Sequence, residues 1–178
     1  MMSARKVSVY IATSVDGYIA TENDSLDWLF RSEPEGDAGY AEFYETVDTI
    51  IMGRRTYDWV MEQVKGKYPY EEKKSYIYTS SPKENESNIT FTSEEPSTLI
   101  DRIKKDDDGT IWLVGGGALI NDFLQNNLID EFIISIAPVL IGKGIPLFKN
   151  SEMEHDLELT EVRRYGQFAQ LYYQIKKS

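Results

Sequence analysis

The chain has 178 residues, 41% of them hydrophobic, which is enough to bury the core of an ordinary globular domain. Its 30 acidic and 19 basic residues give a formal net charge of -11, which argues against nucleic acid and anionic membrane surfaces as partners. The absence of cysteine excludes disulfides, iron–sulfur clusters and thiolate zinc sites, and a single histidine argues against an imidazole-rich metal site, so we expect no metal.

The start of the sequence carries no long apolar stretch of the kind found in signal peptides and membrane spans. We therefore expect a cytoplasmic protein that acts on a small molecule. Neither an internal repeat nor a linker divides the chain, so residues 1–178 are predicted to form one domain.

A first strand is predicted at residues 7–11, where apolar residues alternate with others. Residues 25–39 are rich in acids, glycine and proline, which predicts a surface connection and no helix. Two aromatic residues in this connection, Trp28 and Phe30, are expected to be shielded from water.

Helices and strands are predicted to alternate through the middle of the chain. Apolar side chains three and four residues apart predict a helix at residues 40–47, and a buried strand follows at residues 50–52. The later patterns predict, in order, a helix at 57–64, strands at 74–79 and 88–92, a helix at 99–103, a strand at 111–114, a helix at 118–124 and a strand at 132–136.

The C-terminal part changes character, because residues 168–175 alternate as in a strand and residues 157–162 suit its hairpin partner. Together the patterns predict an α/β fold with flanking helices. Its central mixed sheet should be parallel in the middle and antiparallel at the C-terminal edge.

Gly115-Gly116-Gly117 is the most informative local motif. It ends a buried strand and opens a helix, so backbone N–H groups can approach an anion closely at the helix N-terminus. The motif does not match the Rossmann fingerprint, and no Walker A pattern is present. Phosphate is the natural ligand, and a tight turn without a ligand is the alternative.

A second motif, Gly53-Arg54-Arg55-Thr56, lies at another junction between a strand and a helix. Thr56 is the predicted N-cap, and the arginines lie where open α/β sheets place their ligands. Arginine commonly accommodates the 2′-phosphate of NADP. The alternative is that Arg54 and Arg55 pair with nearby surface acids.

These pieces resemble the dihydrofolate reductase superfamily, and within it the branch of the riboflavin-biosynthesis reductase, the RibD C-terminal domain. The matching segments span nearly the whole chain, and the last of them distinguishes the riboflavin-type branch: residues 14–20, 27–28, 48–57, 112–117, 130–131 and 136–148.

The resemblance implies a dihydrofolate reductase-like three-layer fold and an NADPH-dependent reductase of a small heteroaromatic or imine substrate. It places the arginine junction at the 2′-phosphate, the hydroxyl-rich end of a strand near the adenosine ribose, and the glycine turn, with a cis peptide between two of its glycines, at the pyrophosphate. The cofactor contacts that it implies are Ala12, Gly17, Ile19, Gly53, Arg54, Arg55, Thr56, Thr79, Ser80, Ser81, Val114, Gly115, Gly116, Gly117, Ala118 and Leu119.

The substrate is expected between the first strand, Trp28 and the helix that carries Tyr40 and Tyr44. For Trp28 the alternative is simple core packing. Folate enzymes protonate their substrate with a buried carboxylate of raised pKa on the helix before the Met-Gly-Arg strand. Counting back from Gly53, that spacing falls near Asp37, whose alternative role is a helix cap; a gap of a residue or two would place Gly39 there instead, and Glu42 is a nearby acid on the same helix. Asp16, beside the expected nicotinamide, is the second candidate, with a turn as its alternative.

Because neither acid is secure, a nucleotide-binding module or sensor without turnover is the alternative function. The segment of residues 138–148 is apolar with little charge, and the riboflavin-type reductases that the chain resembles form dimers. A homodimer and a monomer both stay open.

Overall fold

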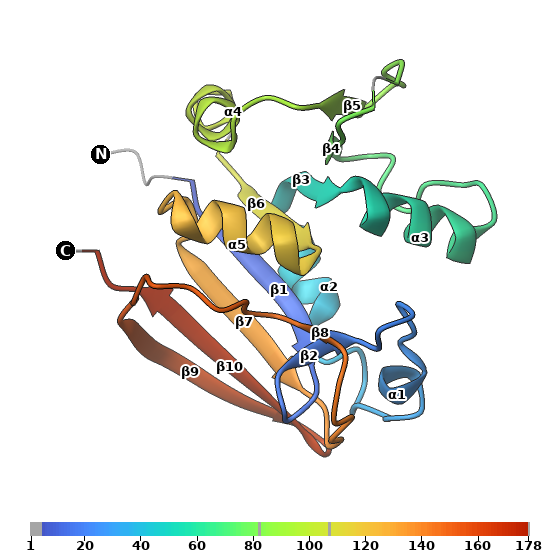
Figure 1. Cartoon of the computed structure of the whole chain (residues 1–178), viewed down its shortest axis with the longest axis vertical. Helices are drawn as coiled ribbons and strands as arrows, with labels where there is room; N and C mark the ends of the chain where they lie inside the picture. The colour runs from blue at the N-terminus through green and yellow to red at the C-terminus, as the bar shows by residue number, and fades with distance from the viewer. Residues whose placement is uncertain (1–4, 82, 107, 178) are drawn as a thin grey trace.

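A computed structural model describes residues 5–81, 83–106 and 108–177. Strands and helices alternate along most of the described chain (Figure 1). The elements are β1 (Val7–Thr13), β2 (Tyr18–Ala20), α1 (Asp27–Phe30), α2 (Tyr40–Thr46), β3 (Val47–Gly53), α3 (Arg54–Val64), β4 (Lys74–Tyr78), β5 (Ile89–Thr92), α4 (Pro96–Ile103), β6 (Thr110–Gly115), α5 (Gly117–Gln125), β7 (Glu131–Ile136), β8 (Ile145–Pro146), β9 (Leu157–Tyr165) and β10 (Phe168–Ile175).

In the described residues, eight strands form one sheet in the order β5-β4-β3-β6-β1-β7-β10-β9. The first six of these strands run parallel, whereas β10 is antiparallel to β7 and β9 is antiparallel to β10. A small second sheet pairs β2 with β8. The predicted mixed sheet with an antiparallel C-terminal hairpin is therefore confirmed.

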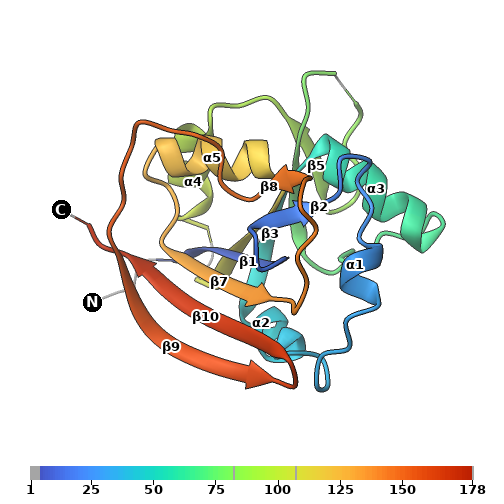
Figure 2. The ribbon, with the colours of Figure 1, turned by 60° about the horizontal axis from the view of Figure 1, so that its bottom comes forward.

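Helices cover both faces of the large sheet, which gives three layers (Figure 2). On one face, α4 and α5 pack their apolar side chains against alternate residues of β1, β6 and β7. On the other face, α2 and α3 cover a core that is rich in aromatic rings. The side chains of each parallel strand alternate between these two cores, so burial on both faces explains the continuous apolar runs in the sequence.

A buried ion pair fixes the edge of the sheet where the parallel strands begin. The Arg5 guanidinium pairs with Asp48 and donates hydrogen bonds to the backbone oxygens of Ile103 and Gly109, at 2.6 and 2.8 Å. Only 2% of the Arg5 side chain is exposed, so this arginine depends on its partners in the fold. The loops that carry the sequence motifs lie at the opposite end of the parallel strands, where their carboxyl ends meet.

Three local predictions are wrong. The connection at residues 25–39 contains the single-turn helix α1, and Phe30 is 63% exposed because it lies on the outer side of that turn. Thr56 is not the N-cap of its helix, since α3 already begins at Arg54 with Gly53 as the N-cap.

Among the described residues, no helix combines the length and the apolar character needed to cross a bilayer.

Candidate functional site

The two sequence motifs lie side by side at the carboxyl edge of the sheet. Neighbouring strands β3 and β6 pair Met52 with Gly115, so the chain leaves both strands at the same level. A Cβ atom added to Gly53 would lie 3.7 Å from the carbonyl oxygen of Gly115 and 3.8 Å from the backbone nitrogen of Gly116. Two helices, α3 and α5, therefore begin next to each other.

Both helices begin in a way that suits an anion. Their N-caps are Gly53 and Gly116, neither makes a side-chain cap hydrogen bond, and neither helix has an acid in its first turn. The first N–H groups of a helix lack intrahelical partners and carry the positive end of the helix dipole. We call residues 53–56 and 115–119 the anion cradle, because they present two such ends together.

Glycine keeps the cradle open and close to the second sheet. A Cβ at Gly117 would approach the carbonyl oxygen of Pro146 in β8 to 2.9 Å and the Ile19 side chain to 3.7 Å. A Cβ at Gly116 would meet only the Thr56 hydroxyl oxygen, at 3.6 Å. The cis peptide that the resemblance implies joins Gly115 to Gly116.

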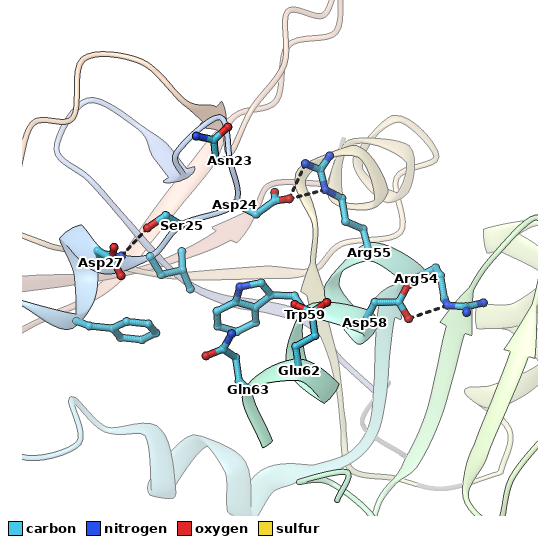
Figure 3. A pocket seen from close by; sticks show the side chains of 12 residues that line it. Asn23, Asp24, Ser25, Asp27, Arg54, Arg55, Asp58, Trp59, Glu62 and Gln63 are labelled. Carbon is cyan, nitrogen blue, oxygen red and sulfur yellow. Dashed lines mark hydrogen bonds and ion pairs between the residues drawn. The ribbon is translucent and has the colours of Figure 1, made fainter. Parts of the chain in front are cut away.

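The two arginines of the junction point in different directions (Figure 3). The Arg54 guanidinium lies 5.8 Å from the centre of the Phe91 ring of β5 and donates to Asp58 at 2.9 Å. Arg55 instead reaches across to Asp24, with an N–O distance of 2.6 Å. Each arginine therefore pairs with an acid, as the alternative hypothesis expects, although both pairs are partly exposed.

The hydroxyl-rich turn at residues 79–81 follows β4 beside the cradle, because Tyr78 pairs with Gly53 in the sheet. Its Thr79 hydroxyl accepts a hydrogen bond from the Ser81 N–H at 3.1 Å, and the Ser80 and Ser81 side chains are exposed. This turn and Arg54 thus lie on the same side of the cradle, next to β4 and β5.

A pocket of about 720 Å³ lies along α3, and both Arg54 and Arg55 belong to its lining (Figure 3). One wall is the segment of residues 23–30, and the other is the outer face of α3 from its first turn to Gln63. The Arg55–Asp24 ion pair joins the two walls. The pocket therefore adjoins the anion cradle through the first turn of α3.

The three predicted substrate-binding side chains do not line this pocket. Trp28 is 2% exposed and packs in a separate core cluster with Ala137 and Phe168, which corresponds to its alternative role. Tyr40 and Tyr44 stack on each other at 5.6 Å in the aromatic core beneath α2. Burial raises the pKa of Tyr44 to about 12.

Asp37 and Asp16 occupy environments opposite to the one that a proton donor needs. Both are fully exposed, and hydrogen bonds to their carboxylates lower their pKa values. Asp37 accepts from the N–H groups of Gly39 and Ala41 at the start of α2, as a helix cap does. Asp16 accepts from the Gly142 N–H at 2.8 Å and ties its turn to the segment before β8.

The other predicted cofactor residues lie around the same edge. Ala12 and Val114 are half-buried near the ends of β1 and β6, and Gly17 is exposed with a φ of +88° in the turn before β2. Ala118 is exposed in the first turn of α5, whereas Leu119 is buried in the core beneath it. Their roles toward a cofactor stay predictions.

Sequence reasoning missed the pocket residues Phe30, Asp27, Trp59 and Glu62. A signal existed in α3, because Arg55, Trp59 and Glu62 recur at spacings of four and three and so share one helix face. The facing wall is the irregular segment of residues 23–30, about 30 residues earlier, and no periodic pattern in the sequence predicts its position.

A comparison with family models matches residues 5–171 to the RibD C-terminal domain. The chain belongs to the RibD C-terminal domain family. Within curated proteins, it is 44% identical to YwjB of Bacillus subtilis (strain 168) over 170 residues, which cover 95% of this chain and 97% of YwjB.

Solved structures agree with this assignment to the RibD C-terminal domain family. A candidate riboflavin biosynthesis protein from Shewanella sp. PV-4 superposes with a TM-score of 0.87 at 29% identity, covering 98% of this chain and all of that one. A deaminase/5-amino-6-(5-phosphoribosylamino)uracil reductase from Thermotoga maritima gives 0.71 at 12% identity, and this chain matches 57% of its length. The latter likeness shows the dihydrofolate reductase-like fold alone.

Proposed function

We propose that this RibD C-terminal domain protein is an NADPH-dependent oxidoreductase that reduces a small heteroaromatic or imine substrate. The observation that carries the proposal is the pair of helix N-termini in the anion cradle, which lie in contact and lack both side-chain caps and acids. A dinucleotide carries its phosphates on one connected molecule, so neighbouring anion sites suit it better than a single phosphate.

The residues around the cradle fit the parts of NADPH. Gly116 and Gly117 leave room for a pyrophosphate against the backbone of α5. Arg54 and the hydroxyl turn at residues 79–81 supply donors for the phosphate at the adenosine ribose. When bound, the reduced nicotinamide would supply a hydride, and the half-buried residues Ala12 and Ile19 would contact its ring.

The ion pairs that now hold the arginines do not prevent phosphate binding. Arg54 pairs with Asp58 along one helix and Arg55 pairs with Asp24, and both pairs are partly exposed. Such pairs contribute about 0–1 kcal/mol, whereas a charge-assisted hydrogen bond to a phosphate contributes about 1.5–3 kcal/mol. A phosphate therefore competes successfully with the carboxylates.

Two measurements test this proposal. The fluorescence of NADPH should change saturably on titration with the protein, and the reduced cofactor should be consumed when a heteroaromatic or imine substrate is added. No binding at millimolar NADPH would contradict the proposal.

The second candidate function is a nucleotide-binding module without turnover. It is favoured by the lowered pKa values of Asp16 and Asp37, which leave neither acid suited to donate a proton. Saturable NADPH binding without consumption across a panel of pterins, aminouracils and cyclic imines would select it over the reductase.

A further inference from the structure

The pocket between residues 23–30 and α3 has the size and the walls of a site for a planar molecule. Its volume is about 720 Å³, within the usual range for small-molecule sites. Phe30 faces solvent from one wall, and Trp59 lies half-buried in the other. An exposed phenyl ring and an indole in one pocket can pack against a flat ligand from both sides.

The charges of this pocket distinguish between classes of planar ligand. Four acids, Asp24, Asp27, Asp58 and Glu62, line it together with two arginines. Both arginines are engaged with two of those acids. Among the ion pairs of the described residues, none involves the carboxylate of Asp27 or of Glu62.

Two carboxylates thus remain uncompensated beside two aromatic rings. A phosphate in this pocket would meet net negative charge, whereas a cation would gain attraction from the carboxylates and from the ring faces. The anion cradle, by contrast, has no acid in the first turn of either helix. The pocket and the anion cradle therefore favour ligands of opposite charge.

We propose, on the basis of the proposed function, that the pocket takes a substrate without a phosphate group whose reducible carbon–nitrogen double bond bears positive charge. An iminium ion or a protonated heteroaromatic ring belongs to this class. A hydride delivered to the carbon of such a bond forms a C–H bond, and the π pair becomes the nitrogen lone pair. Charge balances without an added proton, in keeping with the exposed, low-pKa environments of Asp16 and Asp37.

Binding of three monosubstituted benzenes that differ in charge tests the charge preference without any turnover. The probes are benzamidine as the cation, benzamide as the neutral molecule and phenyl phosphate as the anion, titrated at low ionic strength with Trp59 fluorescence as the signal. Trp59→Phe identifies the part of the signal that comes from the pocket. We expect benzamidine to bind about tenfold more tightly than phenyl phosphate.

The double variant Asp27→Asn/Glu62→Gln should remove most of this preference, and its matched control, Asp101→Asn/Glu158→Gln on α4 and β9, should keep it. Equal or tighter binding of phenyl phosphate with a Trp59-dependent signal would overturn the inference, as would an unchanged preference in the Asp27/Glu62 variant. NADPH titration of the same samples reports separately on the proposed function, since the cradle does not include either acid.

Discussion

Arg54 and Arg55 stand next to each other in the sequence, but the structure gives them different surroundings and so predicts different effects. Arg54 lies over Phe91 beside the hydroxyl turn, where a 2′-phosphate would lie, whereas Arg55 holds Asp24 across the pocket. In the proposed complex, Arg54 would gain a phosphate contact of about 1.5–3 kcal/mol and give up its ion pair with Asp58, which contributes about 0.3–0.5 kcal/mol. Replacing Arg54 by alanine should remove both. The net loss of about 1–2.5 kcal/mol corresponds to about 5- to 70-fold weaker NADPH binding.

The assay is a pair of fluorescence titrations, one with NADPH and one with NADH, on each variant. NADH lacks the 2′-phosphate, so Arg54→Ala should leave its dissociation constant nearly unchanged. Arg55→Ala should change the NADPH-to-NADH ratio less than Arg54→Ala does. Arg164→Ala serves as the matched control, because this exposed arginine lies on the C-terminal hairpin and bonds the backbone oxygen of Gly166. An unchanged ratio in Arg54→Ala would refute the placement of the 2′-phosphate.

Three further outcomes follow from the structure. Gly116→Val should weaken NADPH binding by about tenfold or more, because the valine side chain fills the space through which a pyrophosphate reaches the backbone. The variant should still fold, since the new Cβ meets only the Thr56 hydroxyl oxygen, at 3.6 Å. An NADPH titration checks the affinity, and thermal melting checks the fold. Asp48→Ala should lower the free energy of unfolding in urea by on the order of 3 kcal/mol, since it leaves the buried Arg5 guanidinium without its carboxylate. Burial raises the pKa of Tyr44 and of Tyr172 from the usual 10.0 to about 12, so the stability that these phenols contribute is complete below pH 10 and is lost as the pH rises toward 12; urea unfolding across this range should show the decline, and Tyr44→Phe should reduce it.

Most of the fold could be predicted from the sequence because its signals are local. The parallel strands are buried on both faces and therefore appear as short apolar runs, and the helices carry stripes at spacings of three and four. The glycine and arginine junctions can also be found in the sequence. Each follows directly on an apolar strand, and glycine allows the backbone to approach a neighbouring group closely. Parallel pairing of β3 with β6 then brings the two junctions together.

The pocket could not be predicted in the same way, because it depends on contacts between distant side chains. Arg55 and Asp24 are 31 residues apart, and only the folded chain shows that they join the two walls. From the sequence, both rings of this connection are expected to be shielded from water. Trp28 is buried in a core as expected, whereas Phe30, two residues later, is exposed and lines the pocket. The single helical turn α1 determines which ring is buried and which is exposed, and a helix of four residues is too short to show a periodic pattern in the sequence.

In the proposed complex, one dinucleotide engages both halves of the anion cradle, residues 53–56 and residues 115–119. The most direct test is to follow the backbone amide resonances of residues 54–56 and 117–119 by nuclear magnetic resonance during a titration with NADPH. The resonances of both groups should shift together along a single saturation curve. Shifts confined to one of the two turns, or no shift at millimolar NADPH, would contradict it.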